Sequence, residues 1–200
     1  MPRKPTAEEK LRELIKSRLM SFKTNADYQD RPSWDEGFML AAYESATRAS
    51  CLHIKTGCVI VRDKRIIAAG YNGAPSGIET CLTRGCRKDL LEIAQGTKGT
   101  GNCRGAHAEI NAMDQIARKD LQGTVLYSVM FPCSHCARSI VGNEISEVVY
   151  SIIYKEPDSL TRDLFSEKGV KLRKYHPDIL KQFIRLMRVH NQRYSKDFSE

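Results

Sequence analysis

The sequence predicts an α/β fold in which helices pack against a mixed sheet of about five strands. Two observations predict it. Segments with helical periodicity alternate along the chain with short runs rich in β-branched residues. Hydrophobic residues make up 41% and charged residues 28% of the 200 positions, which is ordinary for a globular protein with a single core. We therefore expect one compact domain with a helical extension at each end.

The first helix is predicted over residues 6–22. Thr6 and Glu9 have the spacing of a capping box, in which each side chain bonds the backbone N–H of the other residue. The helix carries an apolar stripe that needs a packing partner, made by Leu11, Leu14, Ile15, Leu19 and Phe22. After a polar break, Ser33 and Glu36 predict the start of a second helix, whose mostly small packing face consists of Phe38, Ala41, Ala42, Ser45, Ala46 and Ala49.

A hairpin and a long insert follow. Residues 58–61 and 66–71 are short β-rich runs, and the charged residues 62–65 between them fit a turn. Residues 72–77 are dense in turn formers and should form a loop. The next segment, residues 78–105, is too long to be structureless inside a compact domain, so we expect something to fasten it.

The rest of the chain alternates between the two kinds of element. Helices are predicted over residues 107–119, 133–143, 160–168 and 178–190, and strands over residues 124–130, 147–152 and 170–173. The last helix carries another apolar stripe, made by Ile179, Leu180, Phe183, Ile184 and Met187. This alternation is typical of a layered α/β sheet.

The net charge of +8 comes from the ends of the chain. Residues 1–31 and 168–200 are basic, whereas the residues between them are close to neutral. A basic excess attracts nucleic acid, anionic lipid or phosphorylated small molecules, but it also fits the solvated faces of terminal helices. No apolar run approaches the length of a membrane span, and the first residues lack the apolar core of a signal peptide. We expect a cytoplasmic protein, in which the seven cysteines favour metal binding over disulfides.

Two short motifs carry the chemistry. His107 is followed by Glu109, and Cys133 and Cys136 form a Pro-Cys-x-x-Cys motif further along the chain. One histidine and two cysteines are a common ligand set for catalytic zinc, which leaves Glu109 free to move protons. A Cys-x-x-Cys pair alone would also fit a redox site or a structural zinc ribbon, but neither gives Glu109 a role. His135 is formally another ligand, although an exposed loop position fits it better.

With these motifs the chain is identified as a member of the zinc-dependent cytidine deaminase superfamily. Residues 31–39, the turn at residues 70–77, His107 to Ala112 and Phe131 to Cys133 resemble the deoxycytidylate (dCMP) deaminase family more narrowly. The resemblance implies a three-layer α/β/α catalytic domain over residues 32–175, between a basic helical extension at residues 1–31 and a basic helix at residues 176–200. It implies hydrolytic deamination of dCMP to dUMP, which supplies thymidylate synthesis, with Glu109 as the catalytic proton carrier.

The resemblance also implies substrate contacts. Asn72 should hydrogen-bond the nucleotide, Asn111 should reach the deoxyribose, and Tyr154 should cover the base. Arg48 matches the family position for the phosphate, with Arg104 as a weaker candidate, and each also fits a surface arginine. In some members the turn takes part in control by dCTP and dTTP, which singles out Gly70, Tyr71 and Gly73. A backbone that needs positive φ would explain the glycines equally well.

Related deaminases carry a second, structural zinc, and by resemblance its ligands here would be Cys51, Cys81, Cys86 and Cys103. Ordinary thiols are the alternative. Family members are commonly homo-oligomers, often hexamers. Two other functions stay open, a cytosine or adenine deaminase acting on single-stranded nucleic acid or tRNA, and a non-catalytic zinc protein that binds a partner. The motif set favours the nucleotide enzyme over both, and it gives no indication of a nucleic-acid or membrane partner.

Overall fold

The computed structural model describes residues 6–24, 32–94, 97, 101–153, 159–182 and 185. The chain divides into two compact units, Met1–Ser33 and Trp34–Glu200, and each is described by itself. In the first unit, helix α1 spans Ala7–Thr24. The predicted capping box is confirmed, because Thr6 N donates to Glu9 Oε2 over 2.7 Å and Glu9 N donates to Thr6 Oγ1 over 3.2 Å.

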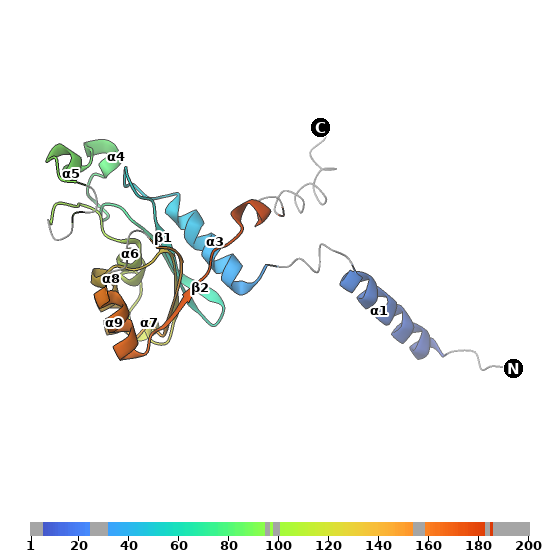
Figure 1. Ribbon diagram of the computed structural model, residues 1–200. Helices are drawn as coiled ribbons and strands as arrows, with labels where there is room; N and C mark the ends of the chain where they lie inside the picture. The colour runs from blue at the N-terminus through green and yellow to red at the C-terminus, as the bar shows by residue number, and fades with distance from the viewer. Residues whose placement is uncertain are drawn as a thin grey trace, which may run out of the picture. The chain divides into compact units, whose positions relative to one another are not determined.

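A five-stranded mixed sheet forms the centre of the second unit, in the order β2-β1-β3-β4-β5, and Figure 1 labels its strands β1 and β2. Its strands are β1 (Gly57–Arg62), β2 (Arg65–Tyr71), β3 (Val125–Met130), β4 (Glu147–Ile152) and β5 (Lys171–Lys174). Strand β1 runs antiparallel to β2 and to β3, whereas β3, β4 and β5 are mutually parallel. The predicted mixed sheet of five strands is therefore confirmed, and its strand boundaries differ from the prediction by a residue or two.

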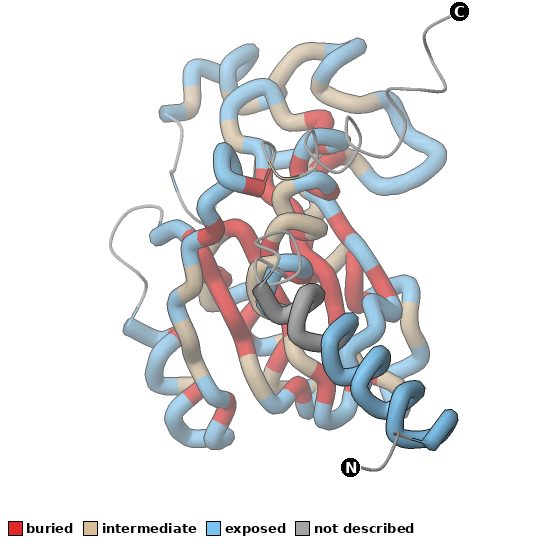
Figure 2. Tube along the Cα trace, turned by 90° about the vertical axis from the view of Figure 1, so that its right-hand side faces the viewer, coloured by how far each residue is buried: buried red, intermediate tan, exposed pale blue. Residues whose placement is uncertain are grey.

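Helices cover both faces of this sheet. Helix α3 (Trp34–Ala46) packs on one face, and helices α6 (Ala108–Met113), α8 (Ser134–Gly142) and α9 (Ser159–Lys168) supply the apolar residues of the other. Successive side chains of β1 point to opposite faces of the sheet. Cys58 and Ile60 join the core under α6, α8 and α9, whereas Val59 and Val61 face α3. Figure 2 shows the buried residues gathered along the strands. The three-layer α/β/α architecture is thus confirmed.

The predicted single helix over residues 107–119 is wrong in one respect. The structure divides it into α6 and a short helix α7 (Arg118–Leu121), with a turn between them and an extended backbone at Ala117. Helix α6 lies against β2 and β1, whereas the next strand, β3, pairs with the far side of β1. The chain must turn back within a few residues to reach that position, and a continuous helix would carry it away.

Short helices also order the insert. These are α4 (Cys81–Arg84) and α5 (Arg87–Leu90). The predicted C-terminal helix is confirmed where it is described, at Ile179 to Gln182 and at Arg185, and the rest of that prediction lies outside the described residues. None of the helices that can be described is both long and apolar enough to span a membrane.

A charged cluster joins the start of this unit to its last described strand. Asp35 at the start of α3 accepts hydrogen bonds from Arg173 Nη1 over 2.7 Å and from Arg173 Nη2 over 2.9 Å. It also accepts one from the Tyr127 hydroxyl over 2.7 Å. The bidentate arginine holds the pKa of Asp35 below its ordinary value. The cluster joins α3 to β5 and β3.

Candidate metal and catalytic site

His107 is held in place by a two-bond bridge to the turn that follows β2. Gly73 N donates to Ala106 O over 3.2 Å, and Ala106 N donates to Gly73 O over 2.9 Å. The next residue, His107, is the N-cap of α6 with an extended backbone. The turn and the histidine, far apart in sequence, are therefore fixed to each other by main-chain hydrogen bonds.

Glycine allows α6 to lie directly on β2. A Cβ built at Gly70 would lie 2.3 Å from Ala108 O, so no side chain fits beneath the start of this helix. The positive-φ explanation for the turn glycines is wrong for Gly70 and Gly73, which are absent from the left-handed residues, and holds for Gly77 at φ 85°. Gly73 is also confined by space, since its Cβ would lie 2.4 Å from Ser50 Oγ. Close approach is the reason for these two glycines.

The two cysteines come from the start of α8. Cys133 is its N-cap, and Cys136 lies in its first turn and is fully buried. The positive end of a helix dipole favours ionised thiols at these positions, as expected from the sequence. Exposure increases from Cys136 through Cys133 to His107, so the donor set opens to solvent on the histidine side.

The three donor atoms have the separations of tetrahedral metal ligands. His107 Nδ1 lies 3.2 Å from Cys136 Sγ and 3.4 Å from Cys133 Sγ, and the two sulfur atoms are 3.9 Å apart. With bonds of about 2.3 Å to sulfur and about 2.0 Å to nitrogen, a tetrahedral zinc ion requires about 3.8 Å between sulfurs and about 3.5 Å between nitrogen and sulfur. The residues therefore fit a zinc ion with one coordination position open.

Electrostatics also favour a cation here. The pKa of Cys133 is lowered to about 3, first by a hydrogen bond from Cys136 and then by one from His107. The pKa of Cys136 is raised, first by its hydrogen bond to Cys133 and then by burial. Without a cation the pair therefore keeps one proton, because two thiolates at this distance repel each other. A divalent cation would remove that repulsion and allow both sulfurs to ionise.

Glu109 lies beside the donor set and is 4% exposed. Its Oε2 accepts a hydrogen bond from Cys136 Sγ over 3.4 Å, and its Oε1 accepts one from Ser128 Oγ over 3.2 Å. Burial raises the pKa of Glu109, which suits a group that must both take and give a proton near neutral pH. Ser128 was not predicted from the sequence. Only the pairing of Ser128 in β3 with Cys58 in β1 places its hydroxyl on the face that α6 covers.

The predicted substrate residues have different surroundings. Asn72 uses both ends of its amide for the chain before β1, since Oδ1 accepts from Thr56 N over 2.9 Å and Nδ2 donates to Ile54 O over 2.8 Å. Asn111 Nδ2 donates to Tyr71 O over 2.7 Å, and no partner of its Oδ1 is found among the residues that can be described. Arg48 is exposed just after α3. Tyr154 lies outside the described residues.

Three basic side chains and one further histidine also have contacts that bear on the site or the insert. Arg104 Nη2 donates to Glu79 O over 3.1 Å and so joins the two ends of the insert. The Lys88 ammonium group is close enough to lower the pKa of His107 slightly, although the hydrogen bond to Cys133 raises that pKa overall. Arg162 lies over the Phe131 ring at 5.1 Å. His135 is exposed, as expected, with its ring centroid 6.2 Å from that of His107.

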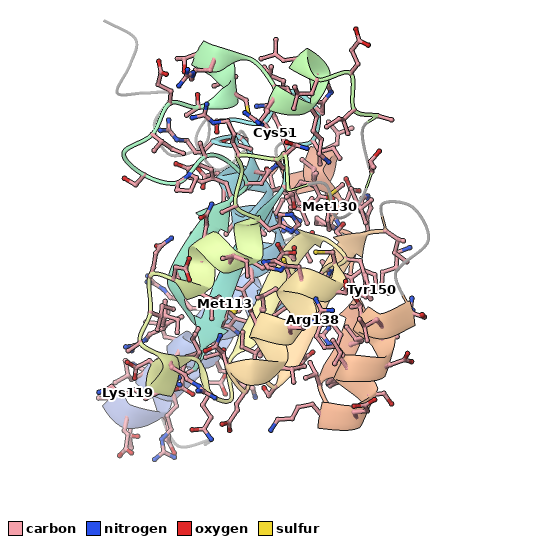
Figure 3. The ribbon with its side chains drawn as sticks, turned by 90° about the vertical axis from the view of Figure 1, so that its left-hand side faces the viewer. Cys51, Met113, Lys119, Met130, Arg138 and Tyr150 are labelled. Carbon is pink, nitrogen blue, oxygen red and sulfur yellow. The ribbon has the colours of Figure 1, made fainter. Side chains whose placement is uncertain are left out.

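The four cysteines of the predicted second metal site share one region of the structure. Cys51 lies beside the insert helices (Figure 3). Burial raises the pKa of Cys81, with further contributions from the other three, Cys86, Cys51 and Cys103. Within the described ranges, however, no three of these sulfurs lie within 4.8 Å of one another, whereas donor atoms of His53, Cys86 and Asp89 do.

His53 and Asp89 form a direct contact in this region. His53 Nε2 lies 2.7 Å from Asp89 Oδ2. The contact joins the segment after α3 to helix α5 of the insert. Neither residue was predicted from the sequence, where no spacing pattern marks them.

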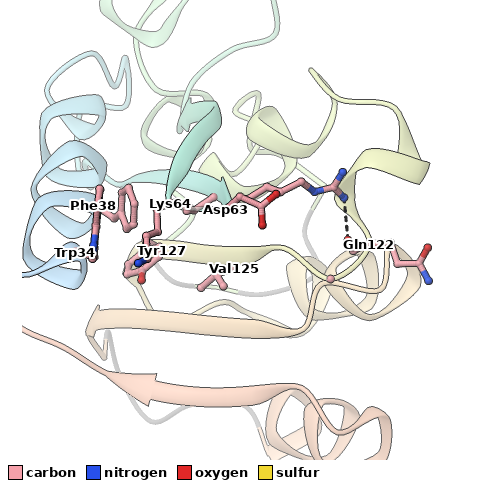
Figure 4. Close-up of a pocket in the computed structure, with 10 residues that line it drawn as sticks. Trp34, Phe38, Asp63, Lys64, Gln122, Val125 and Tyr127 are labelled. Carbon is pink, nitrogen blue, oxygen red and sulfur yellow. Dashed lines mark hydrogen bonds between the residues drawn. The ribbon is translucent and has the colours of Figure 1, made fainter.

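A separate open pocket of about 540 Å³ lies at the end of β1, away from the metal motifs (Figure 4). Trp34 and Phe38 of α3 line one side with stacked rings, and Lys64 of the hairpin turn lies 5.6 Å from the Trp34 ring centroid. Arg62 donates to the Gln122 carbonyl group on the other side. The pocket shares no residue with the donor set described above.

Comparison with known proteins agrees with the geometry. The family profile described as "Cytidine and deoxycytidylate deaminase zinc-binding region" matches residues 32–152. The chain is 33% identical to human deoxycytidylate deaminase over 79% of this chain and 86% of that protein. It is 40% identical to the Schizosaccharomyces pombe enzyme of that name over 74% of this chain, but this match spans only 45% of the longer yeast protein.

A solved structure is also similar. The dCMP deaminase from cyanophage S-TIM5, in complex with dCMP and dUMP, superposes with a TM-score of 0.59 and is 27% identical, over 72% of this chain and 98% of that chain. The match therefore covers nearly all of the phage protein.

Proposed function

Because the chain belongs to the cytidine and deoxycytidylate deaminase family, we propose that it catalyses the hydrolytic deamination of dCMP to dUMP with release of ammonia. The observation that carries the proposal is the set of His107, Cys133 and Cys136 donors with the buried Glu109 carboxyl group directly beside them. One water is consumed and one ammonia released, so the reaction needs no redox partner. The dCMP bound to the phage relative supports this choice of substrate.

His107, Cys133 and Cys136 would hold a zinc ion, which when bound supplies the Lewis acidity that makes water nucleophilic near neutral pH. Glu109 accepts the proton of the attacking water, delivers it to ring nitrogen N3, and then helps to protonate the departing amino group. Ser128 holds Oε1 of this carboxyl group, which restricts its rotation while protons move. Burial keeps the carboxyl pKa raised, so that proton transfer in both directions is accessible.

Asn111 and Arg48 are our candidates for the nucleotide contacts. Asn111 Oδ1, for which the described residues supply no donor, is an acceptor suited to a sugar hydroxyl, and the exposed Arg48 guanidinium is suited to the phosphate. Asn72 serves the same site by fixing residues 54–56, because both ends of its amide are already engaged there. The role of Tyr154 in covering the base stays a prediction.

One side-by-side assay tests the reaction and the substrate. Purified protein is given dCMP, dCTP, cytidine and a short single-stranded oligonucleotide that contains cytosine, and ammonia release is measured. We expect dCMP to be preferred. Deamination of the oligonucleotide alone would refute the proposal and favour the nucleic-acid deaminase predicted as an alternative. If the zinc-loaded protein deaminates none of the four compounds, the non-catalytic zinc protein that binds a partner becomes the better hypothesis.

A second zinc would fasten the insert. Two donor sets support it, the four cysteines predicted by resemblance and the cluster of His53, Cys86 and Asp89. Elemental analysis should find two zinc ions per chain. Loss of the second ion in Cys103→Ser but not in His53→Ala would assign it to the cysteines, and the reverse result would assign it to the histidine cluster. One zinc ion in the unaltered chain would rule out both.

The proposal extends to regulation, assembly and location. Control by dCTP and dTTP would act through Gly70, Tyr71 and Gly73, because this turn is bonded to the residue before His107. Titrating each triphosphate against dCMP turnover tests it, and unchanged turnover would remove the turn from regulation. The hexamer would appear in light scattering as six times the 22.7 kDa chain mass. A cytoplasmic location stays a prediction.

A further inference from the structure

Helix α1 has an apolar face that no other described residue of its own unit covers. The unit Met1–Ser33 contains no other described helix or strand. Leu11, Leu14 and Ile15 are 55%, 53% and 49% exposed, and Figure 2 colours as exposed every residue of α1 whose burial is described. A lone helix of 18 residues is marginal in water, even with an intact capping box. Its stability therefore requires packing of the apolar face.

Charges on the same face indicate what could pack there. Glu8, Leu11, Ile15 and Arg18 recur at helical spacing, so the apolar pair lies between an acidic residue and a basic residue. If two such helices pair antiparallel around a two-fold axis at the level of residue 13, Leu11 of each lies against Ile15 of the other. The same register brings Glu8 of each against Arg18 of the other. A parallel pair would instead place like charges together.

We propose that the face formed by Glu8, Leu11, Ile15 and Arg18 is an interaction surface for a second copy of this chain, which pairs through α1 in antiparallel orientation. The surface is complementary to itself in both apolar contact and charge. Glu8 now contacts Arg12 over 2.7 Å, but both side chains are more than 70% exposed, and such pairs exchange partners at little cost. The proposal does not depend on the proposed function.

Charge exchange across the pair tests the register. Glu8→Arg and Arg18→Glu should each weaken association of the full chain by about fivefold in sedimentation at low salt, and the double variant should restore it. Glu13→Arg makes the same change of charge on the opposite face and should have no effect. A double variant that associates no better than the single variants, or equal disruption by Glu13→Arg, would overturn the proposal.

Photochemical crosslinking identifies the partner directly. Benzoylphenylalanine replaces Leu14 at the edge of the face, and isotope-labelled and unlabelled chains are mixed so that links between copies can be recognised. We expect links that join residues 7–24 of two copies, and their loss in Leu11→Asp with Ile15→Asp. Links found only to residues 34–200 would overturn the proposal. The proposal would also be overturned if the unaltered chain bound anionic vesicles and the double variant lost this binding with its assembly unchanged. A membrane would then be the partner of α1.

Discussion

Substituting Gly70 should damage the catalytic site by displacing helix α6, and the overlap of the added side chain gives the size of the displacement. In Gly70→Ala the new methyl carbon would lie 2.3 Å from Ala108 O and 2.6 Å from Ala112 N. Ordinary contact begins at 3.4 Å, so α6 must move by about 1.1 Å, the difference between 2.3 Å and 3.4 Å. Both obstacles are backbone atoms of α6, which cannot rotate away. His107 and Glu109 lie at the start of this helix and move with it.

A shift of about 1 Å in catalytic groups can lower a rate about 100-fold, and overpacking costs about 1–3 kcal/mol of stability. We therefore expect Gly70→Ala to lose about two orders of magnitude in kcat/KM for dCMP and to bind zinc less tightly. Steady-state kinetics, zinc analysis and thermal unfolding measure the three effects. The kinetics must be recorded well below the unfolding temperature, so that loss of folded protein does not imitate loss of rate.

Gly57→Ala provides a matched control. Its methyl carbon would lie 2.3 Å from Ala42 O, the same overlap, but against α3 on the opposite face of the sheet. It should cost similar stability and leave kcat of the folded protein within about threefold, because α3 carries no residue of the donor set, while KM rises if Arg48 after α3 contacts the phosphate. Equal loss of rate in the two variants, or full activity in Gly70→Ala, would refute the argument that Gly70 acts as a spacer for the metal site.

Three further predictions concern single side chains. Glu109→Gln should retain its zinc and lose about 10²- to 10⁴-fold in kcat, and retained turnover would remove Glu109 from the proton path. Arg173→Ala should lower stability by about 1.5–3 kcal/mol at pH 7. Asp35 has a lowered pKa in the folded state, so its contribution is complete above the ordinary pKa of about 4 and is lost as pH falls through the lowered value. Acid unfolding curves of Arg173→Ala should therefore be flatter in that range, and parallel curves would contradict this origin. Thr161→Val should stabilise the fold by about 1 kcal/mol in urea unfolding, because the buried Thr161 hydroxyl has no partner among the described residues, and destabilisation would imply one.

Local chemistry in the sequence was sufficient to predict most elements of the fold. The spacing of Thr6 and Glu9 predicted the start of α1, and the confirmed hydrogen bonds are local to that turn. The two short β-rich runs and the charged residues between them likewise predicted the hairpin of β1 and β2. The break between α6 and α7 was missed because it depends on where β3 lies in the sheet, which no short window of sequence contains.

The candidate site shows the same division between local and long-range information. His107, Cys133 and Cys136 were predicted because their residue types and spacing carry the chemistry by themselves. Ser128 was missed, since a serine in a strand acquires its contact with Glu109 only through the pairing of β1 with β3. For Gly70 the sequence offered regulation or backbone freedom as explanations and missed close packing, because the constraint is a helix that lies almost forty residues further along the sequence.

The residues around the donor set and those of the insert are held in different ways. His107, Glu109 and Cys136 are fixed by helices packed on the sheet, where their neighbours are buried and their geometry is constrained. The insert is held mainly by partly exposed polar contacts, such as the one between His53 and Asp89. Exposed contacts of this kind contribute little stability and tolerate substitution. Substitutions that break the contact between His53 and Asp89 should therefore leave His107, Cys133 and Cys136 in place, and zinc analysis of Asp89→Asn should find the catalytic ion retained.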